Sequence, residues 1–82
     1  MDISGKVAVI TGGASGLGRA ILEKLISQGA KAAIFDLNEE VGSALAAELG
    51  DNVIYQSVNV ADEASTQQGI DNVMAAFGAI HI

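Results

Sequence analysis

The stretch ITGGASGLGRAI, residues 10–21, places four of the chain's ten glycines within seven positions. A β-branched apolar run precedes it, and apolar side chains at helical spacing follow it. Glycine loses more backbone freedom on folding than any other residue, so such a cluster requires a compensating cause. A tight strand-to-helix turn with positive φ accounts for one or two of the glycines. A ligand that lies directly against the backbone accounts for the others.

This order of strand, glycine-rich loop and helix predicts a phosphate-binding site. Backbone N–H groups and a helix N-terminus bind phosphate, and the loop supplies both. We expect Gly12 to turn the chain toward the ligand, Gly16 to admit a diphosphate, and Gly18 to let helix and strand pack closely. The hydroxyl groups of Thr11 and Ser15 can add donors, although in a protein without a ligand such residues only cap the turn and the helix.

The glycine spacing, T-G-x-x-x-G-x-G, differs from two common phosphate-binding patterns. A P-loop ends in Gly-Lys-Ser/Thr, whereas Gly18 is followed here by Arg19. The G-x-G-x-x-G pattern also fails, because Ile21 stands where it requires its third glycine.

Apolar, β-branched segments alternate with segments of helical periodicity along the chain. Such apolar segments are typical of parallel strands buried on both faces. They cover residues 6–11, 31–36 and 53–60, and a fourth strand is expected to start at residues 79–82. The order β-α-β-α-β-α with right-handed crossovers predicts an α/β fold, the N-terminal half of a doubly wound parallel sheet. We expect the spatial strand order three, two, one, with the fourth strand beside the first.

Helix boundaries follow from capping residues. Asn38 and Asp62 are expected N-caps of the second and third helices, and glycines end all three helices. Gly42 and Gly69 lie inside helices, where each costs about 1 kcal/mol relative to alanine, so these helices depend on tertiary packing. The apolar residues at helical spacing, expected to face the sheet, are Leu17, Ile21, Leu22, Leu25, Ile26, Val41, Leu45, Leu49, Ile70, Val73, Met74 and Phe77.

Asp36 ends the second predicted strand, eighteen residues after Gly18. At this spacing an acidic residue reaches the ribose hydroxyls of a dinucleotide bound to the loop. Its carboxylate can accept hydrogen bonds from both hydroxyls and would repel a 2′-phosphate, so we expect the unphosphorylated dinucleotide, NAD. An acid that merely ends a strand is the alternative.

The composition excludes several other classes. A net charge of −6 without a basic stripe makes nucleic acid a poor partner. The absence of cysteine excludes disulfides and favours a cytoplasmic protein, and no apolar run approaches the ~20 residues that cross a membrane. No metal site is expected. His81, the only histidine, is given no role, and Tyr55, the only tyrosine, is expected to pack in its strand.

The stretch VAVITGGASGLGRA, residues 7–20, resembles the opening of the short-chain dehydrogenase/reductase family, whose cofactor loop reads TGxxxGxG. The resemblance covers the whole chain. It implies that Asp36 selects NAD, and that Asn59-Val60 lies where the family has Asp-Val beside the adenine. Leu37 stands where members that prefer NADP carry a basic residue. The implied cofactor-binding residues are Gly12, Ser15, Gly16, Leu17, Gly18, Asp36, Leu37, Asn59 and Val60.

The segments GGASGLG and LGDNV are similar to type II 3-hydroxyacyl-CoA dehydrogenases. This resemblance implies hydride transfer between NAD and an alcohol or ketone such as a 3-hydroxyacyl-CoA, in a homo-oligomer. The family's Asn-Asn-Ala-Gly segment and catalytic Ser, Tyr and Lys would follow Ile82. We therefore expect residues 1–82 to be a partial NAD-binding domain with no catalytic residue and no turnover of its own.

Two alternatives remain open. Because the first predicted strand lacks a neighbour, the chain could instead act as a self-associating or partner-binding module. A methyltransferase also binds an adenosine nucleoside with a glycine loop and an acid, although the T-G-x-x-x-G-x-G spacing disfavours it.

Overall fold

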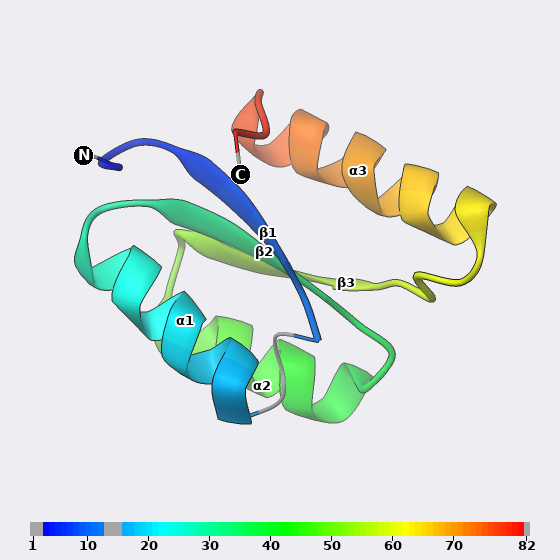
Figure 1. Ribbon diagram of the computed structural model, residues 1–82, viewed down its shortest axis with the longest axis horizontal. Coiled ribbons are helices and arrows are strands. Elements are labelled where there is room, and N and C mark those ends of the chain that lie inside the picture. Colours follow the sequence, from blue (N-terminus) through cyan, green and yellow to red (C-terminus); the bar gives the residue numbers. More distant parts are fainter. Residues whose placement is uncertain (1–2, 13–15, 82) are drawn as a thin grey trace.

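The computed structural model describes residues 3–12 and 16–81, which form a parallel sheet between two layers of helices (Figure 1). Helices α1 and α2 cover one face of the sheet, and α3 covers the other. The spatial strand order β1-β2-β3 confirms the α/β fold and the expected order. In these described residues the elements are β1 (Val7–Thr11), α1 (Gly16–Ser27), β2 (Lys31–Asp36), α2 (Glu39–Leu49), β3 (Val53–Ser57) and α3 (Glu63–Phe77).

The central strand β2 is buried on both faces of the sheet. Its four interior residues, Ala32 to Phe35, are all buried, as the unbroken apolar run predicted. The parallel register pairs Val7 with Lys31 and Ala32 with Val53. As a result, the carboxyl ends of the strands lie at one edge of the sheet.

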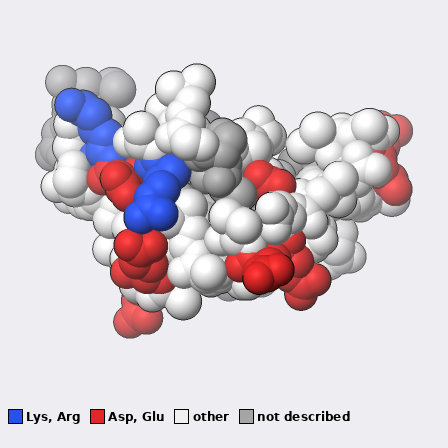
Figure 2. Space-filling model, turned by 90° about the horizontal axis from the view of Figure 1, so that it is seen from below, with Lys and Arg blue, Asp and Glu red and all other residues white. Residues whose placement is uncertain are grey.

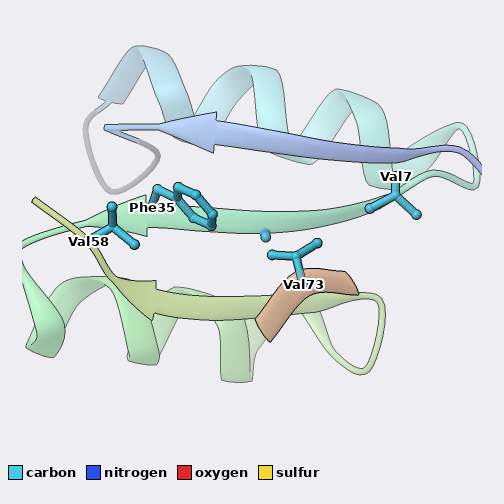
Figure 3. Packing of buried hydrophobic residues seen from close by; sticks show 5 residues of the cluster. Val7, Phe35, Val58 and Val73 are labelled. Carbon is cyan, nitrogen blue, oxygen red and sulfur yellow. The ribbon is translucent and has the colours of Figure 1, made fainter. Parts of the chain in front are cut away.

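Alternate residues of β2 belong to two separate hydrophobic clusters, because successive side chains of a strand point to opposite faces. Ala33 and Phe35 pack against α3, and Ala32 and Ile34 pack against α1 and α2. Figure 3 shows the first cluster, in which Val73 of α3 packs together with Val7, Phe35 and Val58. The buried members of the first cluster are Val7, Ala33, Phe35, Val58 and Val73, and those of the second are Leu22, Ala32, Ile34, Leu45 and Val53.

Each helix buries one glycine and one larger residue a turn later. The pairs are Gly18 with Leu22, Gly42 with Leu45, and Gly69 with Val73. A Cβ at Gly42 would overlap the Tyr55 ring, and one at Gly69 would lie 2.7 Å from Val58 Cγ2. Real Cβ atoms do not approach this closely, so these glycines let α2 and α3 lie against the sheet. The packing gained by this close approach offsets the cost of placing glycine inside a helix.

This glycine-centred packing overturns part of the expected core. Leu22, Leu45 and Val73 are buried as predicted. Four further predicted residues are partly buried against the two clusters, namely Ile26, Leu49, Ile70 and Phe77. The prediction was wrong for four exposed helix positions. The buried stripe runs through the glycines, so apolar residues beside it stay at the surface. The exposed ones are Leu17, Ile21, Val41 and Met74.

The third strand is shorter than predicted. It ends at Ser57 rather than at residue 60. Local hydrogen bonds replace the ladder there: the Asn59 N–H donates to Ser65 Oγ at 3.0 Å, and Asn59 Oδ1 accepts from the Ala61 N–H at 3.1 Å. Side chains such as asparagine stabilise turns in this way and end the extended conformation.

Residues 79–81 adopt no strand, but His81 lies beside β1. The His81 N–H donates to the Val7 carbonyl at 2.8 Å, and the Val7 N–H donates to His81 Nδ1 at 3.0 Å. The expected fourth strand is therefore reduced to one residue held against the first strand, and Ile82 lies outside the described residues. His81, to which the sequence assigned nothing, supplies an acceptor to a buried backbone group. Among the described residues, no helix has the length and apolar character needed to span a membrane.

Candidate functional site

A hollow of about 360 Å³ lies where the carboxyl ends of the strands meet. We call it the strand-end hollow. In open parallel sheets, ligands bind in the crevice outside these strand ends. Five of the predicted cofactor-binding residues line it, namely Gly12, Asp36, Leu37, Asn59 and Val60. The remaining lining residues are Thr11, Phe35 and Val58.

Gly12 turns the chain out of β1 at one wall of the hollow. Its φ is +66°, in the left-handed region that side chains disfavour, and its N–H donates to the Phe35 carbonyl at 2.9 Å. Apart from its chain neighbours, no described residue has an atom within 4 Å of a Cβ placed at Gly12. The positive φ thus favours glycine, and no described residue other than its chain neighbours fills the space that a side chain would take.

Gly16 and Gly18 of the loop lie at the start of α1. Gly16 is the first residue of α1, and a Cβ placed there meets no described atom within 4 Å outside its chain neighbours and the adjacent backbone of α1. Gly18 is buried, in agreement with its expected packing role, whereas Leu17 is exposed. None of these residues lines the strand-end hollow, and the predicted residue Ser15 lies outside the described residues.

The N-terminus of α1 suits an anion electrostatically. A helix N-terminus carries partial positive charge that favours anions. The first turn of α1 contains no acidic residue. In contrast, α2 begins with Glu39 after the N-cap Asn38, and α3 begins with Glu63 after the N-cap Asp62. The positive end of α1 is therefore not met by an acidic side chain of its own first turn.

Asp36 also lines the hollow, and hydrogen bonds from Asn38, Tyr55 and Val58 help to hold it in place. Its Oδ1 accepts from the Asn38 N–H at 2.9 Å. Its backbone carbonyl accepts from the Tyr55 hydroxyl at 2.6 Å and from the Val58 N–H at 3.4 Å. The carboxylate therefore lies on an anchored turn, in the same hollow as Gly12.

The other walls of the strand-end hollow are uncharged. Leu37 and Val60 are both largely exposed, and Asn59 carries an amide where the resemblance implied an acid. Among the described residues that line the hollow, Asp36 alone has a charged side chain. The hollow thus combines one anionic group with apolar rims.

Arg19, which follows the last loop glycine, is not among the residues that line this hollow. Its guanidinium lies 2.8 Å from Glu23 Oε1 on α1 and 3.0 Å from Glu48 Oε1 on α2. The hydrogen bond to Glu23, together with the charge of Glu48, raises the pKa of Arg19 above its ordinary value. Figure 2, which looks onto the face covered by α1 and α2, shows basic side chains lying against acidic ones at one end. Arg19, the basic residue that follows the loop in the sequence, therefore links α1 to α2 through Glu48.

Tyr55 makes a contact with Asp36 that the sequence did not reveal. The sequence predicted a packing role, and its ring does pack with the cluster under α1 and α2. Its hydroxyl contact with Asp36 joins residues nineteen positions apart. Only the parallel register, in which Asp36 pairs with Ser57, brings the two residues together.

The sequence profile of the short chain dehydrogenase family matches residues 6–82. The chain belongs to the short-chain dehydrogenase family. This membership confirms the resemblance seen in the loop and decides against the methyltransferase alternative.

Curated short-chain dehydrogenases match nearly all of this chain. It is 41% identical over 81 residues to the 3-hydroxyacyl-CoA dehydrogenase type-2 of Homo sapiens, covering 99% of this chain and 31% of that protein. It is 39% identical over 79 residues to a 2,5-dichloro-2,5-cyclohexadiene-1,4-diol dehydrogenase of Sphingobium indicum, covering 96% and 32%. The chain thus spans about a third of the length of these relatives.

Solved structures of short-chain dehydrogenases share the fold closely. A family member from Burkholderia phymatum in complex with NAD matches with a TM-score of 0.93 and 38% identity, over 99% of this chain and 30% of that chain. A 3-ketoacyl-(acyl-carrier-protein) reductase from Brucella melitensis, complexed with NADH, matches with a TM-score of 0.92 and 29% identity, over 95% and 32%.

Proposed function

We propose that residues 1–82 form the part of a short-chain dehydrogenase that binds the adenosine and diphosphate portions of NAD. One observation carries the proposal: the glycine turn at Gly12 and the carboxylate of Asp36 share the strand-end hollow. The similar structures from Burkholderia phymatum and Brucella melitensis, crystallised with NAD and NADH, support it.

The described residues fit such a dinucleotide. The side-chain-free surface at Gly12 and Gly16 would accept the diphosphate, with backbone N–H donors at the start of α1. The Asp36 carboxylate would accept from the ribose hydroxyls. Leu37 and Val60 would flank the adenine, and Asn59 would offer its amide to the base. Ser15, which lies outside the described residues, remains a proposed donor to the diphosphate.

The charge of the hollow favours NAD over NADP. A 2′-phosphate would bring negative charge next to Asp36, and no basic side chain stands among the described residues that line the hollow. Since like charges at short range repel in a partly buried site, NADP should bind more weakly than NAD.

For the complete protein we propose oxidation of a hydroxyl group or reduction of a ketone, with NAD supplying the hydride chemistry. The relatives are named as dehydrogenases of a diol, a 3-hydroxyacyl-CoA and a hydroxysteroid, which are all alcohols. A 3-hydroxyacyl-CoA is the proposed substrate, in view of the 41% identity to the type-2 enzyme. The 82 residues contain no Tyr-x-x-x-Lys, so they should show no turnover alone. Homo-oligomerisation and a cytoplasmic location remain predictions.

Calorimetric titration with NAD and NADP tests the binding proposal. We expect NAD to bind more tightly than NADP. Asp36→Ala should weaken NAD binding by about tenfold or more, because hydrogen bonds to a charged group are lost. Asp51→Ala, which removes an exposed acid far along the chain from the loop, is the matched control and should leave the affinity for NAD unchanged. Absence of NAD binding, or equal loss in both variants, would contradict the proposal.

A further inference from the structure

Tyr55 contacts the backbone of the residue proposed to bind the ribose. Tyr55 pairs with Ile34 in the register of β3 and β2, and its side chain extends toward the carboxyl end of β2. There its hydroxyl donates to the Asp36 carbonyl at 2.6 Å. This group is part-buried, so the bond is shielded from competing water.

Among the bonds from Asn38, Tyr55 and Val58 to Asp36, the bond from Tyr55 is the shortest. The Val58 N–H reaches the same carbonyl only at 3.4 Å, beyond the usual range for N–H···O bonds. The Asn38 N–H binds Oδ1 of the side chain, not the carbonyl. The Tyr55 hydroxyl is thus the closer of these two donors to the Asp36 carbonyl, and it restrains the orientation of the peptide that follows Asp36.

The ring that carries this hydroxyl is itself restrained. It packs with the cluster of Leu22, Ala32, Ile34, Leu45 and Val53. On its α2 side it occupies the space that a side chain at Gly42 would require. A ring restrained on these sides delivers its hydroxyl to one place.

We propose that Tyr55 is a positioning residue for recognition of the adenosine ribose. Resting on the proposed function, this inference states that Tyr55 orients the Asp36 peptide and thereby directs the carboxylate toward the ribose hydroxyls. Tyr55 is not among the residues that line the strand-end hollow, so it acts through Asp36 and not by touching the dinucleotide. A carboxylate that accepts from two adjacent hydroxyls tolerates little rotation, so loss of this restraint weakens ribose binding selectively.

The test compares the Tyr55→Phe variant with the parent, which is the same protein without the substitution. The variant removes the hydroxyl and keeps the ring. Calorimetry measures the affinity for NAD and for an NAD analogue that lacks the 2′-hydroxyl of the adenosine ribose. We expect Tyr55→Phe to weaken NAD binding by about three- to tenfold, the effect of one hydrogen bond, and to change affinity for the analogue much less.

Asn72→Ala is the matched control. Its Nδ2 donates to Gln56 Oε1 at 2.7 Å, so this variant also removes a part-buried hydrogen bond from β3. It leaves Asp36 untouched, and the preference for NAD over the analogue should stay at the parent value. A second measurement needs no ligand: in Tyr55→Phe, the Asn38 amide should exchange its hydrogen faster because the Asp36 turn is loosened.

The outcomes separate this inference from the proposed function. If the parent binds NAD and Tyr55→Phe retains both its affinity and its preference for the 2′-hydroxyl, Tyr55 has no positioning role and the proposed function stands. Equal weakening of NAD and the analogue would indicate a general structural role and would also overturn the inference, as would unchanged exchange at Asn38. If the parent binds no NAD, both proposals fail.

Discussion

Gly69 of α3 lies so close to Val58 that a Cβ at this position would stand 2.7 Å from Val58 Cγ2. The same Cβ would lie 3.0 Å from Phe35 Cζ, in the cluster under α3. Both neighbours are buried residues at the carboxyl ends of the strands. The distance between α3 and the sheet is therefore set by the absence of a side chain at one helix position.

Gly69→Ala should destabilise the fold. Overpacking costs typically 1–3 kcal/mol, against a gain of about 1 kcal/mol in helix propensity, so we expect a net loss of roughly 1 kcal/mol. Urea denaturation measures it. Gln68→Ala, at an exposed position of α3, should change the free energy of unfolding by less than about 0.5 kcal/mol. Increased stability of Gly69→Ala would refute the close-packing argument.

Gly12→Ala and Gly50→Ala form a second matched pair. Both glycines have positive φ, +66° and +92°, and apart from its chain neighbours neither has a described atom within 4 Å of an added Cβ. Each alanine should cost about 1–2 kcal/mol through left-handed backbone strain. Only Gly12 lies in the strand-end hollow, so Gly12→Ala alone should also weaken NAD binding, by about tenfold. Similar NAD affinities in the two variants would remove Gly12 from the site.

Arg19→Met should lower the melting temperature slightly at low salt. The guanidinium links α1 to Glu48 of α2, but the ion pair is solvent-exposed and contributes little. Its contribution should disappear in about 1 M salt, where the Debye length falls to roughly 3 Å. Lys24→Met, on the same helix, serves as the charge-matched control. A difference between the variants that persists in high salt would argue for a packing role of Arg19.

His81→Ala should expose the start of β1. The buried Val7 N–H would lose its acceptor, His81 Nδ1, at a cost of about 1 kcal/mol or more. Hydrogen exchange at the Val7 amide should accelerate in this variant. His81→Asn should restore part of the protection, because its side-chain oxygen can reach the same N–H. Unchanged exchange in His81→Ala would show that this contact does not protect the strand.

The local sequence predicted the features that depend on neighbouring residues. The caps are of this kind: Asn38 accepts from the Val41 N–H, Asp62 accepts from the Ala64 and Ser65 N–H groups, and Gly78 adopts φ +79°. Strand order followed as well, because right-handed crossovers allow few arrangements of alternating strands and helices. Gly12 and Asp36 lie at strand ends as predicted, because one follows and the other closes an apolar run.

Periodicity could not reveal which apolar side chains are buried. The helices contact the sheet through Gly42 and Gly69, so Val41 and Met74 remain exposed despite their favourable spacing. Hydrophobic patterns count apolar residues and assign no packing role to glycine. The early end of β3 was missed for a similar reason, since the hydrogen bond from the Asn59 N–H to Ser65 belongs to a folded turn.

Amino-acid order along the chain was thus sufficient for the type and order of the three strands and three helices and for the caps of α2 and α3, because these features rest on interactions within a few residues. The distance between helix and sheet, and the bond from Tyr55 to Asp36, arise only when strands align side by side. That register joins residues nineteen positions apart, a separation at which local propensity carries no information.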